Sequence, residues 1–185
     1  MRKVVHSRHP DDVIDHVPVA TLRAARTRRL ERLLRRHPVA VTHHDKMAGI
    51  IGDHISDKIR VFGRYEREEL EALDAFVLTR LPGRRRCCVD VGANIGNHCL
   101  HFSRRFDKVL AFEPNPLAVD LLQWNLRANG IRNVTVHAVG LAEQVATATM
   151  SIVDRNLGAS HLDPHPATGS SGGDRVQVDM VRCDE

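Results

Sequence analysis

Short apolar runs alternate along this chain with longer segments of helical periodicity. The runs at 87–91, 108–113 and 134–139 predict buried strands, and the segments at 97–106 and 115–128 between them predict helices. A repeated order of strand, helix and strand is typical of a parallel sheet with right-handed crossovers. We therefore predict an α/β fold.

The second of these helices has sequence signals at both ends. Asn115 can cap it, Pro116 suits its first position, and Gly130 can end it. Its apolar stripe consists of Leu117, Leu121, Trp124 and Ala128.

Further elements are expected before and after these segments in the sequence. An Arg-rich segment over 19–36 and an amphipathic segment over 66–81 predict helices, and we expect the second to lie against the sheet. Alternating residues at 146–153 and 175–181 predict two more strands. The loop from Gly158 to Gly173, rich in Gly, Ser and Pro, is either a lid over a substrate pocket or a disordered segment.

The glycine-rich segment that follows the first buried strand is the strongest candidate for a binding loop. Gly92 and Gly96 permit backbone angles and close approaches that a side chain would forbid. Asp90 precedes this loop, and Glu113 ends the next strand 23 residues later. A carboxylate roughly 20 residues beyond such a loop can accept both hydroxyls of a ribose. The loop reads Gly-x-x-x-Gly, so the dinucleotide fingerprint is absent and a dinucleotide is disfavoured.

Three segments resemble the FkbM-type methyltransferases, which use S-adenosylmethionine (SAM). They are VDVGANIGNHCLHF, VLAFEPNPLAVDLLQWNLRANG and NVTVHAVGLAE, and an upstream IRVFGRYEREEL is similar to a Gly-x-Tyr-Glu segment of the family. The resemblance covers roughly 55–150. It implies a Rossmann-like SAM methyltransferase sheet with helices on both faces.

The resemblance also implies roles for residues around the cofactor. Asp90 would hold the methionine amino group, Glu113 the ribose, and Tyr65 with Glu66 would close over the cofactor carboxylate, although an ordinary helix start explains that pair nearly as well. The other cofactor-binding residues that we expect are Gly92, Ala93, Asn94 and Gly96 in the loop, Pro114 and Asn115 after Glu113, and Ala138 and Val139 near the adenine.

Methyl transfer from a sulfonium is a direct displacement, which requires alignment and exclusion of water and no covalent catalyst. We therefore name no catalytic residue. The leading hypothesis is SAM-dependent O-methylation of a small molecule or sugar. One alternative is a non-catalytic SAM-binding remnant that needs a partner or a missing carboxyl-terminal half, and a weaker one is a nucleotide-linked oxidoreductase.

The family pattern continues after the segment VQVDMVRCDE into further strands, so the resemblance predicts a sheet truncated at its carboxyl end. The strand at 87–91 would then present an apolar edge open to a second copy or a partner chain. We divide the chain into a basic leader at 1–45 and a methyltransferase-like domain at 46–185.

Composition and charge limit the classes of partner and ligand that we expect. The 1–86 half holds 19 Lys and Arg against 12 Asp and Glu, but aromatic side chains for base stacking are missing from its densest part, so nucleic acid is disfavoured. The 4 cysteines and 12 histidines show no metal-ligand spacing, and we predict neither disulfides nor a metal. No run is long enough to span a membrane, and a cytoplasmic location is the default expectation.

Overall fold

The structure is a computed structural model that describes residues 39–41, 45–81, 83, 85–153, 156–162 and 174–184. The helix expected over 19–36, most of the leader and residues 163–173 of the loop lie outside the described residues. One described strand, β1 (Val39–Val41), falls within the expected leader and pairs antiparallel with β2 (Ala48–Ile50).

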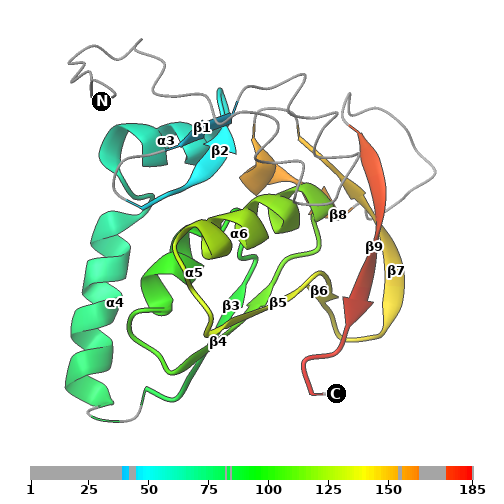
Figure 1. Ribbon diagram of the computed structural model, residues 1–185. Helices are drawn as coiled ribbons and strands as arrows, with labels where there is room; N and C mark the ends of the chain where they lie inside the picture. Colours follow the sequence, from blue (N-terminus) through cyan, green and yellow to red (C-terminus); the bar gives the residue numbers. More distant parts are fainter. Residues whose placement is uncertain are drawn as a thin grey trace.

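The predicted parallel sheet is confirmed. Strands β3 (Cys87–Val91), β4 (Lys108–Phe112) and β5 (Val134–His137) lie side by side in sequence order, and each neighbouring pair is parallel (Figure 1). Between them run α5 (Asn97–Phe102) and α6 (Pro116–Ala128). The first of these helices is shorter than the sequence indicated.

A second sheet follows in the chain. Its order is β6 (Gly140–Leu141), β9 (Arg175–Val181), β7 (Ala146–Ser151) and β8 (His161–Leu162), with η1 (Leu157–Ala159) preceding β8. The two long strands β7 and β9 are antiparallel, as their alternating pattern suggested. The face of β9 that carries Val176, Val178 and Met180 is buried against Met150 in a small core of its own.

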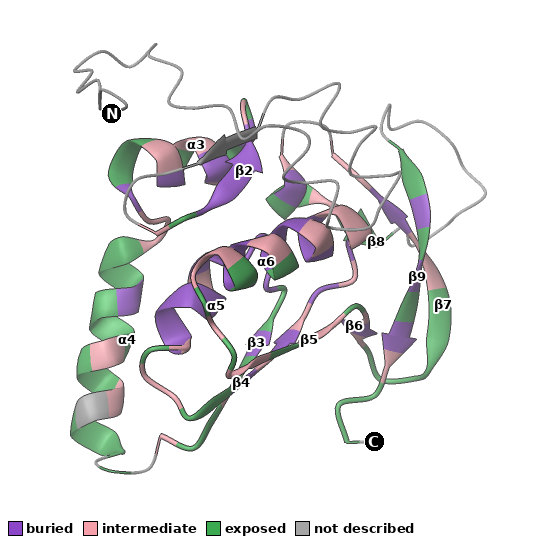
Figure 2. Cartoon of the chain, viewed as in Figure 1, coloured by how far each residue is buried: buried purple, intermediate pink, exposed green. Residues whose placement is uncertain are grey.

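Helices cover one face of the parallel sheet. The inward-facing Val109 and Ala111 of β4 are completely buried in the main core with Leu121 and Leu122 of α6. On the opposite face, Val89 is 49% exposed and Val91 is 61% exposed. Figure 2 shows exposed residues along β3. The expectation of helices on both faces is therefore wrong for the described residues, because the chain places α5 and α6 on the same side.

Helix α4 (Arg67–Arg80) also departs from expectation. Leu70 is buried, but Leu73 and Phe76 are 40% and 58% exposed, so its apolar stripe does not lie against the sheet. The helix stands beside α5 (Figure 1), and its Asp74 contacts His101 of α5 and Arg105 in the turn that follows α5. Helix α3 (His54–Phe62) precedes it and is capped by the carboxylate of Asp53.

Asn125 joins three parts of the core. Its side chain, on α6, accepts from the N–H of Ala48 (2.6 Å) and donates to the carbonyls of Ala48 (3.1 Å) and Ile95 (2.7 Å). The residue is completely buried. Buried backbone groups need such partners, so Asn125 connects β2 and the glycine loop to the helix layer.

We expect Asn125→Leu to lower the free energy of unfolding by about 2–3 kcal/mol, because it leaves buried backbone groups without partners at similar side-chain volume. Denaturant unfolding measures this difference. Gln123→Leu, at an exposed position of the same helix, is the matched control and should stay close to the parent chain. Equal stability of the two variants would contradict the role of Asn125.

Candidate functional site

The loop between β3 and α5 turns on two glycines with different roles. Gly92 has φ +76° and open space where a Cβ would lie, whereas Gly96 has φ +94° and a Cβ there would lie 2.5 Å from Leu122 Cδ1. Both need positive φ. The close approach at Gly96 serves packing against α6, and Gly92 is the position where a ligand can approach the backbone.

Glu113 holds this loop against the end of β4. Its carboxylate is only 6% exposed and accepts the N–H of Asn94 on Oε2 and the N–H of Asn115 on Oε1, each at 2.8 Å. Asn94 has φ 48°, an uncommon angle for a residue other than glycine. Gly92 and Ala93 also donate their N–H groups to the carbonyl of Phe112, at 2.9 and 3.1 Å.

Asp90 lies on the neighbouring strand and is also 6% exposed. Its Oδ2 accepts from the thiol of Cys99, with Sγ at 3.0 Å. Burial raises the pKa of that thiol, and the charge of Asp90 raises it further, so Cys99 stays protonated and donates. Burial likewise raises the pKa of Glu113, against the lowering effect of its two backbone hydrogen bonds, and the charge of Asp90 adds to the rise. The charge of Asp90 therefore acts on the carboxyl group of Glu113.

Asn115 carries an unpartnered donor at the same edge. The residue is 1% exposed, and its Oδ1 caps α6 by accepting the N–H of Leu117 (3.1 Å). Its Nδ2 is buried without a hydrogen-bond partner among the described residues. A buried orphan donor costs free energy, which a ligand acceptor would recover. This edge of the sheet therefore offers one unused donor beside the carboxylate of Glu113.

The remaining expected residues lie around the same strand ends. Ala138 and Val139 follow β5, whose last residue, His137, accepts the N–H of Glu113 at 3.1 Å. Pro114 lies between Glu113 and Asn115 and packs near Gly140 of β6. Tyr65, between α3 and α4, is joined through its backbone to Asn97, the residue after Gly96. These hydrogen bonds bring Tyr65 beside the end of the loop, and the other residues named here follow the carboxyl ends of β4 and β5.

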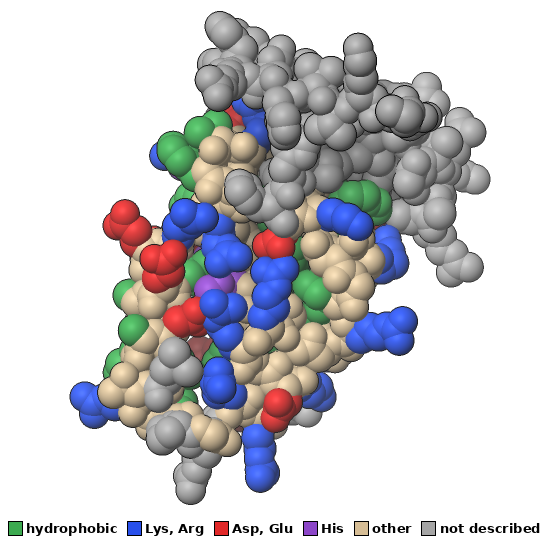
Figure 3. Space-filling view, turned by 60° about the vertical axis from the view of Figure 1, so that its left-hand side comes forward, with side chains coloured by type: hydrophobic (Ala, Val, Ile, Leu, Met, Phe, Trp, Pro, Cys, Tyr) green, Lys and Arg blue, Asp and Glu red, His purple; other side chains and the backbone are tan. Residues whose placement is uncertain are grey.

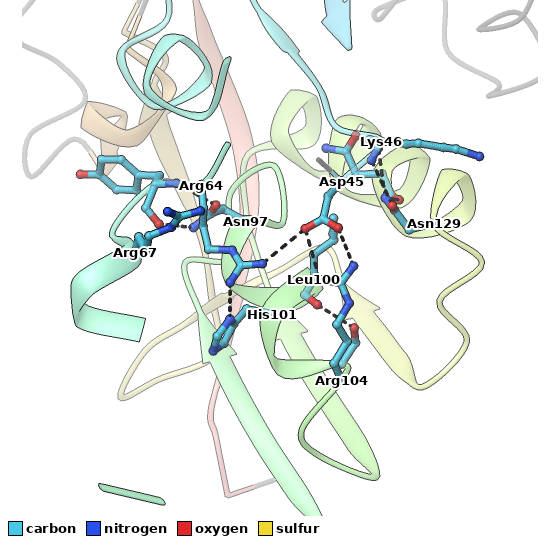
Figure 4. A network of polar contacts seen from close by, with 12 residues as sticks. Asp45, Lys46, Arg64, Arg67, Asn97, Leu100, His101, Arg104 and Asn129 are labelled. Carbon is cyan, nitrogen blue, oxygen red and sulfur yellow. Dashed lines mark hydrogen bonds and ion pairs between the residues drawn. The ribbon is translucent and has the colours of Figure 1, made fainter. Parts of the chain in front are cut away.

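A polar network lies beside this site on α5. His101 is completely buried, with Nε2 donating to Asp74 (3.0 Å) and Nδ1 accepting from Arg64 (3.0 Å), as Figure 4 shows for the second contact. Arg64 also contacts Asp45, which pairs with Arg104. Lys and Arg side chains form a band down this face, with acidic side chains among them (Figure 3).

Sequence reasoning did not identify Asn97, Cys99 and Asn125 as contacts of the loop and its neighbours. An amide residue next to the apolar stripe of a helix is the sequence signal that could have identified Asn125.

Comparison with known proteins identifies the family of this chain. Residues 90–185 match the family model described as the Methyltransferase FkbM domain. The chain belongs to the FkbM methyltransferase family. Over 79 residues it is 37% identical to methyltransferase sdnD of Sordaria araneosa, an alignment that covers 41% of this chain and 30% of that protein. This FkbM-family chain thus aligns with less than a third of that relative's length.

The described residues include neither a metal site nor a membrane-spanning helix. They contain no group of three or more His, Cys, Asp or Glu side chains placed to hold a metal ion. None of the described helices has the length and apolarity needed to cross a membrane. All four cysteines are free thiols.

The buried His101 predicts a dependence of stability on pH. Burial lowers the pKa of its imidazole from 6.5, although the hydrogen bond to Asp74 opposes this. Below pH 6.5 the unfolded chain therefore binds a proton that the folded chain excludes, and stability falls as the pH decreases.

Between pH 7 and pH 5 we expect the free energy of unfolding of His101→Gln to fall less, or rise more, than that of the parent chain, because the Gln amide can keep both contacts without titrating. Denaturant unfolding of both proteins at the two pH values measures this. Burial alone would raise the pKa of Asp74, but hydrogen bonds from Arg105 and His101 lower it. Asp74 therefore changes the stability only at more acidic pH. An identical pH dependence in the variant would contradict the account.

Proposed function

We propose that this chain binds SAM and belongs to an enzyme that methylates a hydroxyl group of a small molecule or sugar. The observation that supports this most is the pair of buried carboxylates, Asp90 and Glu113, on neighbouring strand ends around a glycine loop with open space at Gly92. When bound, SAM would supply an activated methyl group on a sulfonium.

The chain's own groups have distinct roles in this proposal. Asp90 would bind the methionine amino group, because a carboxylate fixed by the Cys99 thiol can accept from an ammonium. Glu113 would accept the ribose hydroxyls with lone pairs that its two backbone contacts leave free. The backbone at Gly92, Ala93, Asn94 and Gly96 would surround the methionine.

Other residues would complete the cofactor site. Asn115 Nδ2 offers an unused donor next to Glu113. Ala138 and Val139, together with Pro114, would bound the adenine at the end of β5, and Tyr65 would lie at the methionine carboxylate.

A groove next to Tyr65 provides room for a small acceptor. It has a volume of about 540 Å³, which lies within the usual range for small-molecule sites. It lies between α3 and the start of α4, with His54, Lys58, Phe62, Tyr65 and Glu66 in its lining. The aromatic rings could pack against the carbon faces of a sugar, and Glu66 could accept from hydroxyls.

Isothermal titration with SAM, S-adenosylhomocysteine and NAD tests the proposal. We expect the 185-residue chain to bind both sulfur cofactors and not NAD. NAD binding without binding of either sulfur cofactor would overturn it and favour an oxidoreductase. SAM binding without turnover on any hydroxylated acceptor would favour a non-catalytic remnant.

Glu113→Ala should weaken SAM affinity by about 1–3 kcal/mol, because the ribose hydroxyls lose their acceptor. Glu143→Ala, at an exposed acidic position, controls for the lost charge. Thermal unfolding of both variants separates a folding defect from a binding defect. A folded Glu113→Ala protein with unchanged affinity would remove Glu113 from the ribose role.

We also propose that the outer edge of β3 pairs with a second copy of the chain. Among the described residues β3 pairs only with β4, and its exposed Val89 and Val91 lie on the uncovered face. Open apolar edges promote association between chains.

Analytical ultracentrifugation over a range of concentrations should show association that Val91→Lys reduces. Thr135→Lys is the control and should leave association unchanged, because Thr135 is an exposed residue of β5, the strand at the opposite edge of the same sheet. A parent chain that stays monomeric throughout would contradict the pairing.

A further inference from the structure

The junction between α3 and α4 is attached to the first turns of α5. Three consecutive residues of the junction contact three residues of one helix. Arg64 donates to Nδ1 of His101, the backbone of Tyr65 bonds with Asn97, and the carboxylate of Glu66 lies 3.1 Å from Nε2 of His98.

Asn97 makes the contact that is nearest to the glycine loop. Its Oδ1 accepts the N–H of Tyr65 at 3.1 Å, and its Nδ2 donates to the carbonyl of Tyr65 at 2.9 Å. The Asn97 side chain is thereby paired with both backbone groups of one residue. Figure 4 shows Asn97 beside Arg64 and Arg67 at this junction.

The backbone at the junction holds conformations that need support. Gly63 has φ 79° and Glu66 has φ 52°, and the second is a costly angle for a residue with a Cβ. Tyr65 lies between these two turns, and its ring meets that of His54 edge to face at 6.2 Å. A strained segment persists only where its surroundings determine it, and the Asn97 amide is a buried contact (8% exposed) that fixes Tyr65 directly.

We infer that Asn97 is a positioning residue for the cofactor site, because it holds Tyr65 and Glu66 beside the glycine loop in the place from which they can contact a bound ligand. This inference rests on the proposed SAM site. Asn97 follows Gly96 directly, so its side chain connects the glycine loop to the junction. The amide acts through the position of Tyr65, not through contact with the reacting atoms.

The test compares Asn97→Ala with Asn133→Ala in the full chain. Asn133 is a matched control, because its Nδ2 also makes two hydrogen bonds to backbone carbonyls, those of Ser103 (2.8 Å) and Phe106 (2.9 Å), at the opposite ends of the strands. Affinity for S-adenosylhomocysteine is measured by isothermal titration, and exchange of the Tyr65 amide hydrogen is measured by NMR.

We expect Asn97→Ala to weaken S-adenosylhomocysteine binding about tenfold and to speed exchange at Tyr65, since the loss of two hydrogen bonds to one residue frees that segment. Asn133→Ala should change neither. Asn97→Asp should not recover the affinity, because its carboxylate has no donor for the Tyr65 carbonyl that Asn97 Nδ2 contacts. Tyr65→Ala should weaken binding in the parent chain and have little further effect in Asn97→Ala.

The outcomes separate the two proposals. If the parent chain binds S-adenosylhomocysteine and both Asn97→Ala and Asn133→Ala bind it with the same affinity as the parent, the positioning role is overturned while the SAM site stands. If Tyr65 and Asn97 act additively, the coupling between them is overturned. If the parent chain binds no S-adenosylhomocysteine, both the SAM site and the role of Asn97 are overturned.

Discussion

The buried carboxylate of Glu113 is the constraint on which the candidate site depends. A charge that is 6% exposed must be hydrogen-bonded, and Glu113 meets this need by accepting one N–H from the glycine loop and one from the segment that starts α6. The loop therefore has little freedom to adopt another path. Glu113 holds the amide of Asn94, whose φ is positive, and Gly92 in the same loop has open space where a Cβ would lie.

Other anchors act on the far side of the loop, and they come from different layers of the fold. Asn125 of α6 holds the carbonyl of Ile95, and Asn97 holds Tyr65 from the junction that precedes α4. The loop is thus fixed by a strand end, by a helix that packs on the sheet and by a segment about 30 residues earlier in the chain. Such fixation suits the proposed site, which would align a ligand without a covalent catalyst, because alignment is what methyl transfer requires. It also explains why the glycine loop and Tyr65 belong to one structural unit in this FkbM-family chain.

Local signals in the sequence predicted most of the core elements. The boundaries of β3 agree with the apolar run before Gly92, and α6 begins at Pro116 with Asn115 as its cap, since capping and turn chemistry act over a few residues. Contacts between distant residues could not be predicted in this way. The bond from Asn125 to Ala48 joins residues 77 apart, and nothing local specifies it. The uncovered face of β3 was missed for a related reason, because the run Cys-Cys-Val-Asp-Val reads the same whether one face or both faces are covered.

One crystal structure would test the proposed roles of Asp90 and Glu113 directly. A crystal structure of this chain with S-adenosylhomocysteine should show the ribose hydroxyls within hydrogen-bonding distance of Glu113 and the amino group of the ligand at Asp90, with Tyr65 still bonded to Asn97. A ligand bound away from the ends of β3 and β4, or one that leaves both carboxylates without contact, would contradict the account.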